Sequence, residues 1–158
     1  EGQILSSCSL PLGSLSLFSQ YVAHLHPTGK ERKAIRAQIR ERLDHFVPAP
    51  PSVPRACGVG GTARAACKVA NRLFGRPQDC RTLSAQELRR LLKTLKKPDH
   101  DHLHLLLKAA PDRIHTLIPG LLVLDTVAQA YQLQEILVSS CGVREGYLHH
   151  RVLKGEGG

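Results

Sequence analysis

Two glycine-containing segments hold the residues best suited to bind a ligand in this sequence. Each follows an apolar run and precedes a helical pattern. The candidate phosphate-binding residues are Gly58, Gly60, Gly61 and Thr62 in the first segment and Gly142, Arg144, Glu145 and Gly146 in the second. The first N–H groups of a helix have no carbonyl partner within the helix and carry partial positive charge. Each turn therefore indicates a place where backbone N–H groups bind phosphate.

Each turn also has an ordinary structural interpretation. Glycine lets the backbone approach an anion closely and Thr62 adds a hydroxyl donor, but the same residues form tight turns that let a helix pack on a sheet. Arg144 is suited to bidentate phosphate binding, with Glu145 orienting it, yet both are also common in the first turn of a helix. Spacing alone leaves both interpretations open.

Other catalytic or metal-binding patterns are weak. The run His100-Asp101-His102-Leu103-His104 crowds imidazoles and a carboxylate together, but no fourth ligand is evident and alternate residues point in different directions on a helix. We expect solvated histidines there and no metal site. No Ser-His-Asp or Cys-His arrangement and no carboxylate pair stands out, so we expect no catalytic residue within this chain. The five cysteines include no C-x-x-C pair, which favours reduced thiols.

The charge balance predicts attraction to polyanions. The 158 residues carry a formal net charge of +9, which suits nucleic acid, an acidic membrane surface or a phosphate-rich small molecule. Two basic helical stripes are solvated faces or polyanion contacts: Arg32, Arg36 and Arg40, and Arg89, Arg90, Lys93, Lys96 and Lys97. There is no Trp, and the few Tyr and Phe disfavour base stacking. No apolar run is long enough for a membrane span and no secretory signal is evident, so we expect a cytoplasmic protein.

The periodicity predicts alternating strands and helices. The expected elements are a strand over 3–10, an apolar segment over 15–22, a helix over 28–46, a strand ending at Cys57, helices over 60–73, 84–95 and 102–109, a buried helix over 112–131 kinked at Pro119-Gly120, a strand over 135–139, a last helix after the second turn, and a frayed tail over 155–158. This order indicates one α/β domain spanning residues 1–158, with ligands at the carboxyl ends of its strands.

Four landmarks resemble the second domain of the exopolyphosphatase and guanosine-pentaphosphate phosphohydrolase (Ppx/GppA) family. They are Ser9-Leu10-Pro11-Leu12-Gly13, then Gly58-Val59-Gly60-Gly61-Thr62, then Pro111-Asp112-Arg113-Ile114 with Ile118-Pro119-Gly120-Leu121-Leu122-Val123-Leu124, and finally Val138-Ser139 with Gly142-Val143-Arg144-Glu145-Gly146. They span almost the whole chain in family order, which makes them far more specific together than one glycine turn.

The resemblance implies an actin-like, ribonuclease H-type fold and a place in phosphate chemistry. Members of this family hydrolyse terminal phosphoanhydride bonds of inorganic polyphosphate or guanosine pentaphosphate, usually with magnesium, in a cleft between two such domains. A carboxylate of the first domain activates water there. By this resemblance Gly58, Gly60, Gly61 and Thr62 match the glycine loop of the second domain. Arg144, Glu145 and Gly146 match the closing motif of the same cleft.

The sequence also departs from the family pattern. The Asp-x-Gly-Gly-Gly-Ser phosphate loop expected ahead of Glu1 is absent, with its strand, and so is the first domain with its catalytic carboxylate. We therefore expect the isolated chain to bind polyphosphate weakly and to hydrolyse it slowly or not at all. The expected partners are polyphosphate or guanosine pentaphosphate and the missing first actin-like domain.

Two other functions remain open from the sequence. One is a nucleic-acid or acidic-partner binding module in which the basic stripes are the site and the glycine segments are only turns. The other is the nucleotide-binding half of a different actin-like kinase or ATPase. Competition by ATP rather than by polyphosphate would favour the latter.

Overall fold

A three-stranded sheet organises the chain. The computed structural model describes residue 4 and residues 7–46, 52–96 and 99–153. The strands are β1 (Arg55–Gly58), β2 (Thr82–Ser84) and β3 (Glu135–Val138), in the spatial order β1-β3-β2. The central strand β3 is parallel to β1, with Gly58 opposite Val138, and antiparallel to β2.

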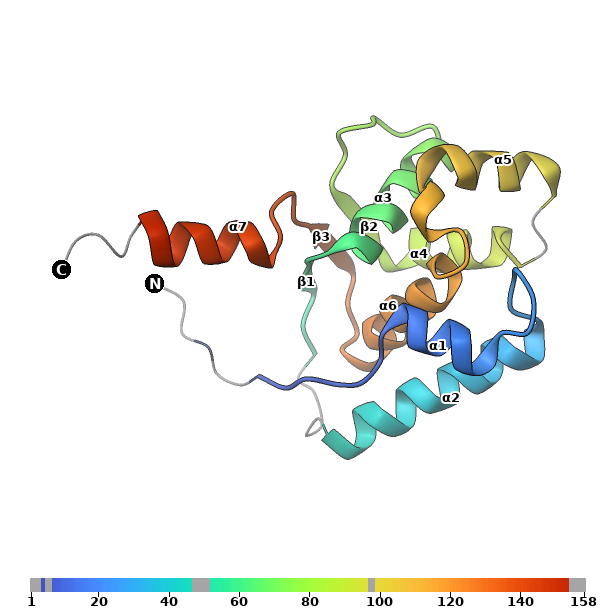
Figure 1. Ribbon diagram of the computed structural model, residues 1–158, viewed down its shortest axis with the longest axis horizontal. Helices are drawn as coiled ribbons and strands as arrows, with labels where there is room; N and C mark the ends of the chain where they lie inside the picture. The colour runs from blue at the N-terminus through green and yellow to red at the C-terminus, as the bar shows by residue number, and fades with distance from the viewer. Residues whose placement is uncertain (1–3, 5–6, 47–51, 97–98, 154–158) are drawn as a thin grey trace.

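Helices cover this sheet and form most of the described chain (Figure 1). They are α1 (Ser14–Tyr21), α2 (Gly29–Phe46), α3 (Gly61–Leu73), α4 (Ala85–Thr94), α5 (His100–Ala109), α6 (Leu117–Ala130) and α7 (Val143–Tyr147), with a 3₁₀ turn at Pro111–Arg113 and a π-helical continuation of α7, η2, at Leu148–Leu153. The architecture is α/β, a small sheet with flanking helices, as the sequence pattern predicts.

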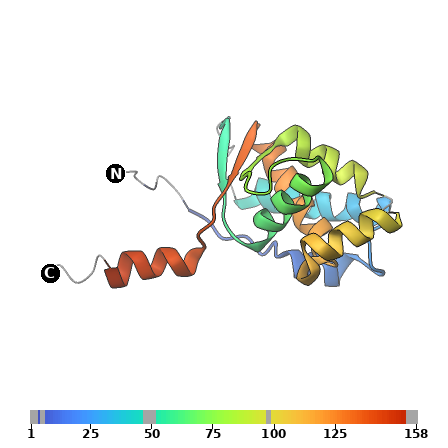
Figure 2. The ribbon, with the colours of Figure 1, turned by 90° about the horizontal axis from the view of Figure 1, so that it is seen from above.

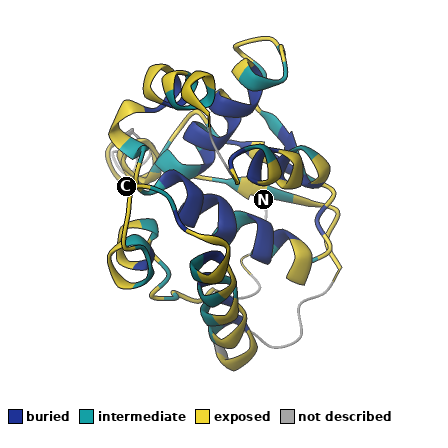
Figure 3. Ribbon diagram, turned by 90° about the vertical axis from the view of Figure 1, so that its right-hand side faces the viewer, coloured by how far each residue is buried: buried dark blue, intermediate teal, exposed yellow. Residues whose placement is uncertain are grey.

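Helix α6 forms the centre of the core. It packs against α1, α2, α3 and α4, and residues 117–122 are all buried (Figure 3). Leu121 and Leu122 meet the apolar faces of the surrounding helices in one cluster that includes Ile35, Ile39 and Leu88. The prediction of a buried helix in this region is confirmed, because a helix that is apolar nearly all round must be covered on every side.

Local signals place several helix starts. Ser84 Oγ accepts from Glu87 N, and Glu87 Oε2 accepts from Ser84 N, which completes the predicted capping box of α4. The Asp99 side chain caps α5 by accepting from His102 N. Helix α5 therefore begins at His100, two residues before the predicted start.

Two expectations for local structure, the first strand and the kink at Pro119, are wrong, and two elements, α1 and β2, were not predicted. The described part of segment 3–10, residue 4 and residues 7–10, contains no strand, and residues 3, 5 and 6 lie outside the described residues. The apolar segment at 15–22 belongs to α1, and the strand β2 was not expected. Pro119 produces no mid-helix kink, because α6 begins at Leu117 and a proline in the first turn displaces no intrahelical hydrogen bond. The expected tail at 155–158 lies outside the described residues.

The first basic stripe is largely structural. Arg32 is buried and donates from Nε to Pro27 O, from Nη1 to Leu92 O and from Nη2 to Leu95 O, so it joins α2 to the last carbonyls of α4. Arg36 Nη1 donates to the buried carboxylate of Asp125 on α6. Arg32 is thus buried and Arg36 only partly exposed, contrary to a fully solvated stripe, because both pair buried polar groups, whereas Arg40 is exposed as expected.

Substitution of Asp125 tests how much this ion pair stabilises the packing of α2 on α6. We expect Asp125→Asn to lower the free energy of unfolding by about 2 kcal/mol, below the range for fully buried pairs because Arg36 is partly exposed. Urea denaturation measures the change. Asp44→Asn, at an exposed carboxylate of α2, is the matched control and should stay within about 0.5 kcal/mol of the parent chain. Equal stability of the two variants would show that the pair contributes nothing.

Candidate phosphate-binding site

The two glycine turns leave the same edge of the sheet. Because β1 and β3 are parallel neighbours, their carboxyl ends lie side by side, and Ser139 N donates to Gly58 O at 3.0 Å. The Cβ position of Gly142 lies 4.0 Å from Arg64 Nη1, on the helix that follows the first turn. The carboxyl edge of the sheet thus brings both sequence-predicted segments together.

Two glycines shape the first turn for different reasons. Gly60 has φ 114° and ψ 179°, a backbone conformation that residues with a Cβ rarely adopt, and it precedes the first residue of α3. Gly58 has no space for a Cβ, because one would lie 2.9 Å from Ala63 Cβ and 3.0 Å from Ile136 Cγ2. Together they hold the start of α3 close against the sheet edge.

The start of α3 carries the donors that an anion needs. Since α3 begins at Gly61, its first N–H groups have no carbonyl partner within the helix. The N-cap residue is Gly60, so no side chain of that residue accepts from them either. The Arg113 guanidinium lies directly over Gly61, where a Cβ would overlap it. Backbone donors and a positive charge therefore lie close together at the start of α3.

A basic pocket extends from this helix start along α3. It has a volume of about 260 Å³, and its charged lining residues are Arg64, Lys68, Asp112 and Arg113, beside Gly61. We call Gly61, Arg64, Lys68 and Arg113 the basic cradle. Its three cations face one carboxylate, Asp112, which leaves a net positive lining suited to a phosphate chain.

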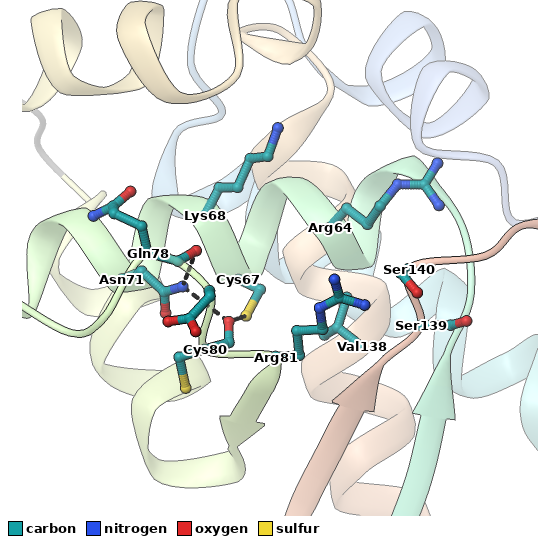
Figure 4. Close-up of a pocket in the computed structure, with 11 residues that line it drawn as sticks. Arg64, Cys67, Lys68, Asn71, Gln78, Cys80, Arg81, Val138, Ser139 and Ser140 are labelled. Atoms are coloured by element: carbon teal, nitrogen blue, oxygen red, sulfur yellow. Dashed lines mark hydrogen bonds between the residues drawn. The ribbon is translucent and has the colours of Figure 1, made fainter.

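A second pocket shares Arg64 and Lys68 with the basic cradle. It has a volume of about 270 Å³ and lies between α3, the loop before β2 and the end of β3. Figure 4 shows Arg64 and Lys68 projecting from the same side of α3, with Arg81, Ser139 and Ser140 near the end of β3. The two pockets thus share two cations of α3, and the second pocket adds Arg81 and the carboxylate of Asp79.

The second turn is capped by a side chain of the helix that follows it. Gly142 N donates to Glu145 Oε2 at 2.7 Å, so Glu145 caps its own helix. Backbone N–H groups at the turn, followed by the charges of Arg144 and Arg64, lower the pKa of the Glu145 carboxyl. Arg144 and Gly146 lie exposed on α7. Phosphate binding at Gly142, Arg144, Glu145 and Gly146 stays a prediction.

Thr62 takes part in packing. Its methyl group lies against Gly120 of α6, where a Cβ would overlap it. This contact fixes the start of α3 against the central helix. A phosphate-binding role for Thr62, as for Gly58, Gly60 and Gly61, stays a prediction.

Sequence reasoning missed the side chains that make the pocket basic. Arg64 and Lys68 follow the first turn at a spacing of four residues, which places them on one face of α3. That spacing was a usable signal. Arg113 was part of a family landmark, but its contact with Gly61 joins residues far apart in the sequence and has no local signal.

The histidine run forms no metal centre in the part of the chain that the structure describes. His102 Nδ1 lies 2.7 Å from Asp99 Oδ1, within the cap of α5. Across residues 7–46, 52–96 and 99–153, no three His, Cys, Asp or Glu side chains are grouped so that they could hold a metal ion. Among the same residues, no helix combines the length and apolar character that crossing a membrane requires.

The fold is an α/β domain with a basic pocket at the start of α3, and the comparisons identify its family. The sequence model of the Ppx/GppA phosphatase family matches residues 1–155, so the chain belongs to this family and the resemblance drawn from its motifs is confirmed. No curated protein sequence matches the chain.

Solved structures share the fold. The Ppx/GppA family member from Aquifex aeolicus matches 96% of this chain with a TM-score of 0.78 and 19% identity, and an exopolyphosphatase from Cytophaga hutchinsonii matches 97% with a TM-score of 0.73 and 19% identity. These matches cover 50% and 51% of the two chains. The present chain spans about half the length of the structures that it matches.

Two thiols in the second pocket have opposite electrostatic environments. Hydrogen bonds from Thr82, followed by the Arg76 guanidinium, lower the pKa of the Cys80 thiol. Burial raises the pKa of the Cys67 thiol, which donates to Cys80 O at 3.1 Å. Arg76 is held in place by an ion pair with Glu87 at 2.9 Å.

Alkylation across a pH series tests these environments. The thiolate is the reactive form, so we expect the rate at Cys80 to reach half of its maximum at a lower pH than the rate at Cys67. Peptide mass spectrometry after short pulses of iodoacetamide measures both rates in one sample. Arg76→Gln should move the Cys80 midpoint to higher pH. A Cys80 midpoint at or above that of Cys67 would contradict the assignment.

Proposed function

We propose that this chain is the phosphate-cleft domain of a phosphatase that hydrolyses terminal phosphoanhydride bonds of inorganic polyphosphate or guanosine pentaphosphate. Membership of the Ppx/GppA phosphatase family supports the reaction class. The observation that carries the proposal is the basic cradle, where Arg113 lies on Gly61 at the start of α3 and Arg64 and Lys68 line the same pocket.

The chemistry of phosphoryl transfer suits this arrangement. The transferred group passes through a state in which negative charge is spread over its oxygens, and positioning and neutralisation of that charge provide most of the catalysis. Backbone N–H groups at Gly61 and the guanidinium of Arg113 supply both. Arg64 and Lys68 then hold the phosphates that follow the terminal one.

The proposed reaction needs a second domain, which supplies the catalytic carboxylate. Under this proposal the fold is an actin-like, ribonuclease H-type domain, and the water-activating carboxylate comes from a first domain of the same kind. The twofold length of the solved structures supports this division. We assign no catalytic residue to this chain and place the whole protein in the cytoplasm.

Magnesium is implied by the family, but the described residues do not form a site for it. Mg²⁺ in phosphate-binding sites is held by one or two carboxylates, phosphate oxygens and water. The basic cradle offers the single carboxylate of Asp112, between cations that repel a metal ion. We therefore derive no step through the metal from this chain and expect its protein ligands on the other half.

The alternative polyanion surfaces are less suited to binding. Arg32 and Arg36 of the first stripe pair with buried carbonyls and a carboxylate. In the second stripe Arg90 lies over the Phe74 ring, 4.6 Å from its centroid. These contacts favour the basic cradle over a nucleic-acid site on either stripe. ATP binding, as in another actin-like kinase or ATPase, would use the same cradle.

Binding of inorganic tripolyphosphate tests the proposal directly. We expect Arg113→Ala to raise the Kd about tenfold, because a charge-assisted hydrogen bond is removed. Lys68→Ala should act in the same direction. Isothermal titration calorimetry at fixed salt measures the change.

Lys33→Ala is the matched control, since it removes the same charge from an exposed position on α2. It should leave the affinity almost unchanged. An equal loss in all three variants would show that only net charge matters. Tighter binding of duplex DNA than of tripolyphosphate, insensitive to Arg113→Ala, would support the nucleic-acid alternative, and tighter binding of ATP would support the kinase or ATPase alternative.

The division of the active site predicts the activity of the isolated chain. We expect phosphate release from polyphosphate to stay near the uncatalysed background, because the activating carboxylate is supplied by the other half. A phosphate-release assay with purified chain, repeated after removal of contaminating phosphatases, measures it. Robust release that disappears in Arg113→Ala would place a catalytic group in this chain and contradict the division.

A further inference from the structure

Two cysteines of one pocket lie on segments that run side by side. After α3 ends, the chain returns beside this helix to reach β2 (Figures 1 and 2). Cys67 lies in the middle of α3 and Cys80 on the returning segment, and both line the pocket of about 270 Å³ shown in Figure 4. The other cysteines, Cys8, Cys57 and Cys141, are exposed elsewhere on the chain.

Hydrogen bonds hold the two cysteines next to each other. Cys67 Sγ donates to Cys80 O at 3.1 Å, and Asn71 Nδ2 donates to the same oxygen at 2.9 Å. A carbonyl oxygen lies about 2.4 Å from the Cα of its own residue, so the Cys67 sulfur lies within about 5.5 Å of Cys80 Cα. In Figure 4 the Cys80 sulfur points away from Cys67. The two sulfurs therefore meet only after the Cys80 side chain rotates about its Cα–Cβ bond.

The Cys80 sulfur has the surroundings of a reactive thiolate. Arg76 Nη2 donates to it, and the Thr82 hydroxyl lies 3.6 Å from it. Arg76 is itself held by its ion pair with Glu87. Cys80 is partly exposed, whereas Cys67 is only 4% exposed. A small electrophile in the pocket thus reaches Cys80 first, at a sulfur whose negative charge the guanidinium stabilises.

We propose that Cys80 and Cys67 form a redox pair, in which a small hydroperoxide oxidises Cys80 and Cys67 then closes a reversible disulfide. The pair is a modification site that takes no part in phosphate chemistry. It does not depend on the function proposed above.

The first step uses the Cys80 thiolate as the nucleophile. Its sulfur attacks the terminal oxygen of the hydroperoxide, the S–O bond forms and the O–O bond breaks. The alkoxide that leaves takes a proton from water and becomes an alcohol. The sulfur has then lost two electrons to the peroxide and is a sulfenic acid. Because the sulfenic acid is uncharged, its hydrogen bond to Arg76 is weaker and the side chain is released to rotate.

The second step uses the Cys67 thiol. It loses its proton, its sulfur attacks the sulfenic sulfur, the S–S bond forms and the S–O bond breaks, and hydroxide leaves with that proton as water. Overall, two thiols and one hydroperoxide give one disulfide, one alcohol and one water. The disulfide ties the segment before β2 to α3, in the pocket that Arg64 and Lys68 also line. A thiol reductant restores both cysteines by exchange.

Oxidation of the purified chain with tert-butyl hydroperoxide tests the pair. At timed intervals the remaining thiols are blocked with N-ethylmaleimide under denaturing conditions, and unreduced peptides are analysed by mass spectrometry. We expect a linked peptide pair that contains Cys67 and Cys80, formed within one chain and removed by dithiothreitol. Cys67→Ser should instead accumulate the sulfenic acid of Cys80, which dimedone captures as a stable adduct.

Substitution of Arg76 tests the role of the guanidinium. We expect Arg76→Gln to slow oxidation of Cys80 at pH 7 about fivefold, because a smaller fraction of the thiol is ionised. Arg72→Gln, at an exposed position of α3, is the matched control and should leave the rate unchanged. Circular dichroism shows whether both variants keep the fold. Equal rates in the two folded variants would overturn the role assigned to Arg76.

Three outcomes would overturn the redox pair itself. One is that Cys67 and Cys80 both stay free at a hydroperoxide concentration that oxidises the exposed Cys57. Another is that Cys80 pairs mainly with Cys8, Cys57 or Cys141, or with a second chain. The third is that dimedone labels the exposed cysteines of Cys67→Ser but not Cys80. None of these results depends on the affinity for tripolyphosphate, so this proposal and the phosphate site are tested separately.

Discussion

The contact between the start of α3 and the carboxyl edge of the sheet is the constraint on which the site depends. The Gly58 backbone meets Ala63 and Ile136 with no space for a side chain, and Gly60 turns the chain through a positive φ. These two features place the first residues of α3 against the sheet edge. A side chain at Gly58 would overlap Ala63 and Ile136, and a side chain at Gly60 would strain the backbone, so either change would disturb the start of the helix.

The remaining elements place charge at that point. The turn between α5 and α6 brings Arg113 over Gly61, and α6 is held by its packing against four other helices and by the pairing of Asp125 with Arg36. Buried arginines elsewhere serve the fold, as Arg32 does at the end of α4. Part of the positive charge of the described chain thus serves structural pairs, and another part lines the basic pocket.

The sequence predicts those features whose causes are local. The capping box of Ser84 and Glu87 lies within one turn, and the first glycine turn precedes a clear helical pattern, so both α4 and α3 could be located. Strand β2 could not, because three residues become a strand only through pairing with β3. The role of Pro119 was misjudged because the helix start at Leu117 depends on the preceding 3₁₀ turn.

In the candidate site, too, the features with local causes could be predicted and those that depend on tertiary contacts could not. The glycine turns were found from sequence, but Arg113 reaches Gly61 only through the tertiary fold, and the fates of Arg32 and Arg36 depend on carbonyls and a carboxylate from α4 and α6. An NMR titration of the isolated chain with inorganic tripolyphosphate tests the central claim most directly. The account predicts that the amide resonances of Gly60, Gly61 and Arg113 shift first and saturate together. Shifts confined to the exposed basic face of α4, with these three amides unmoved, would contradict it.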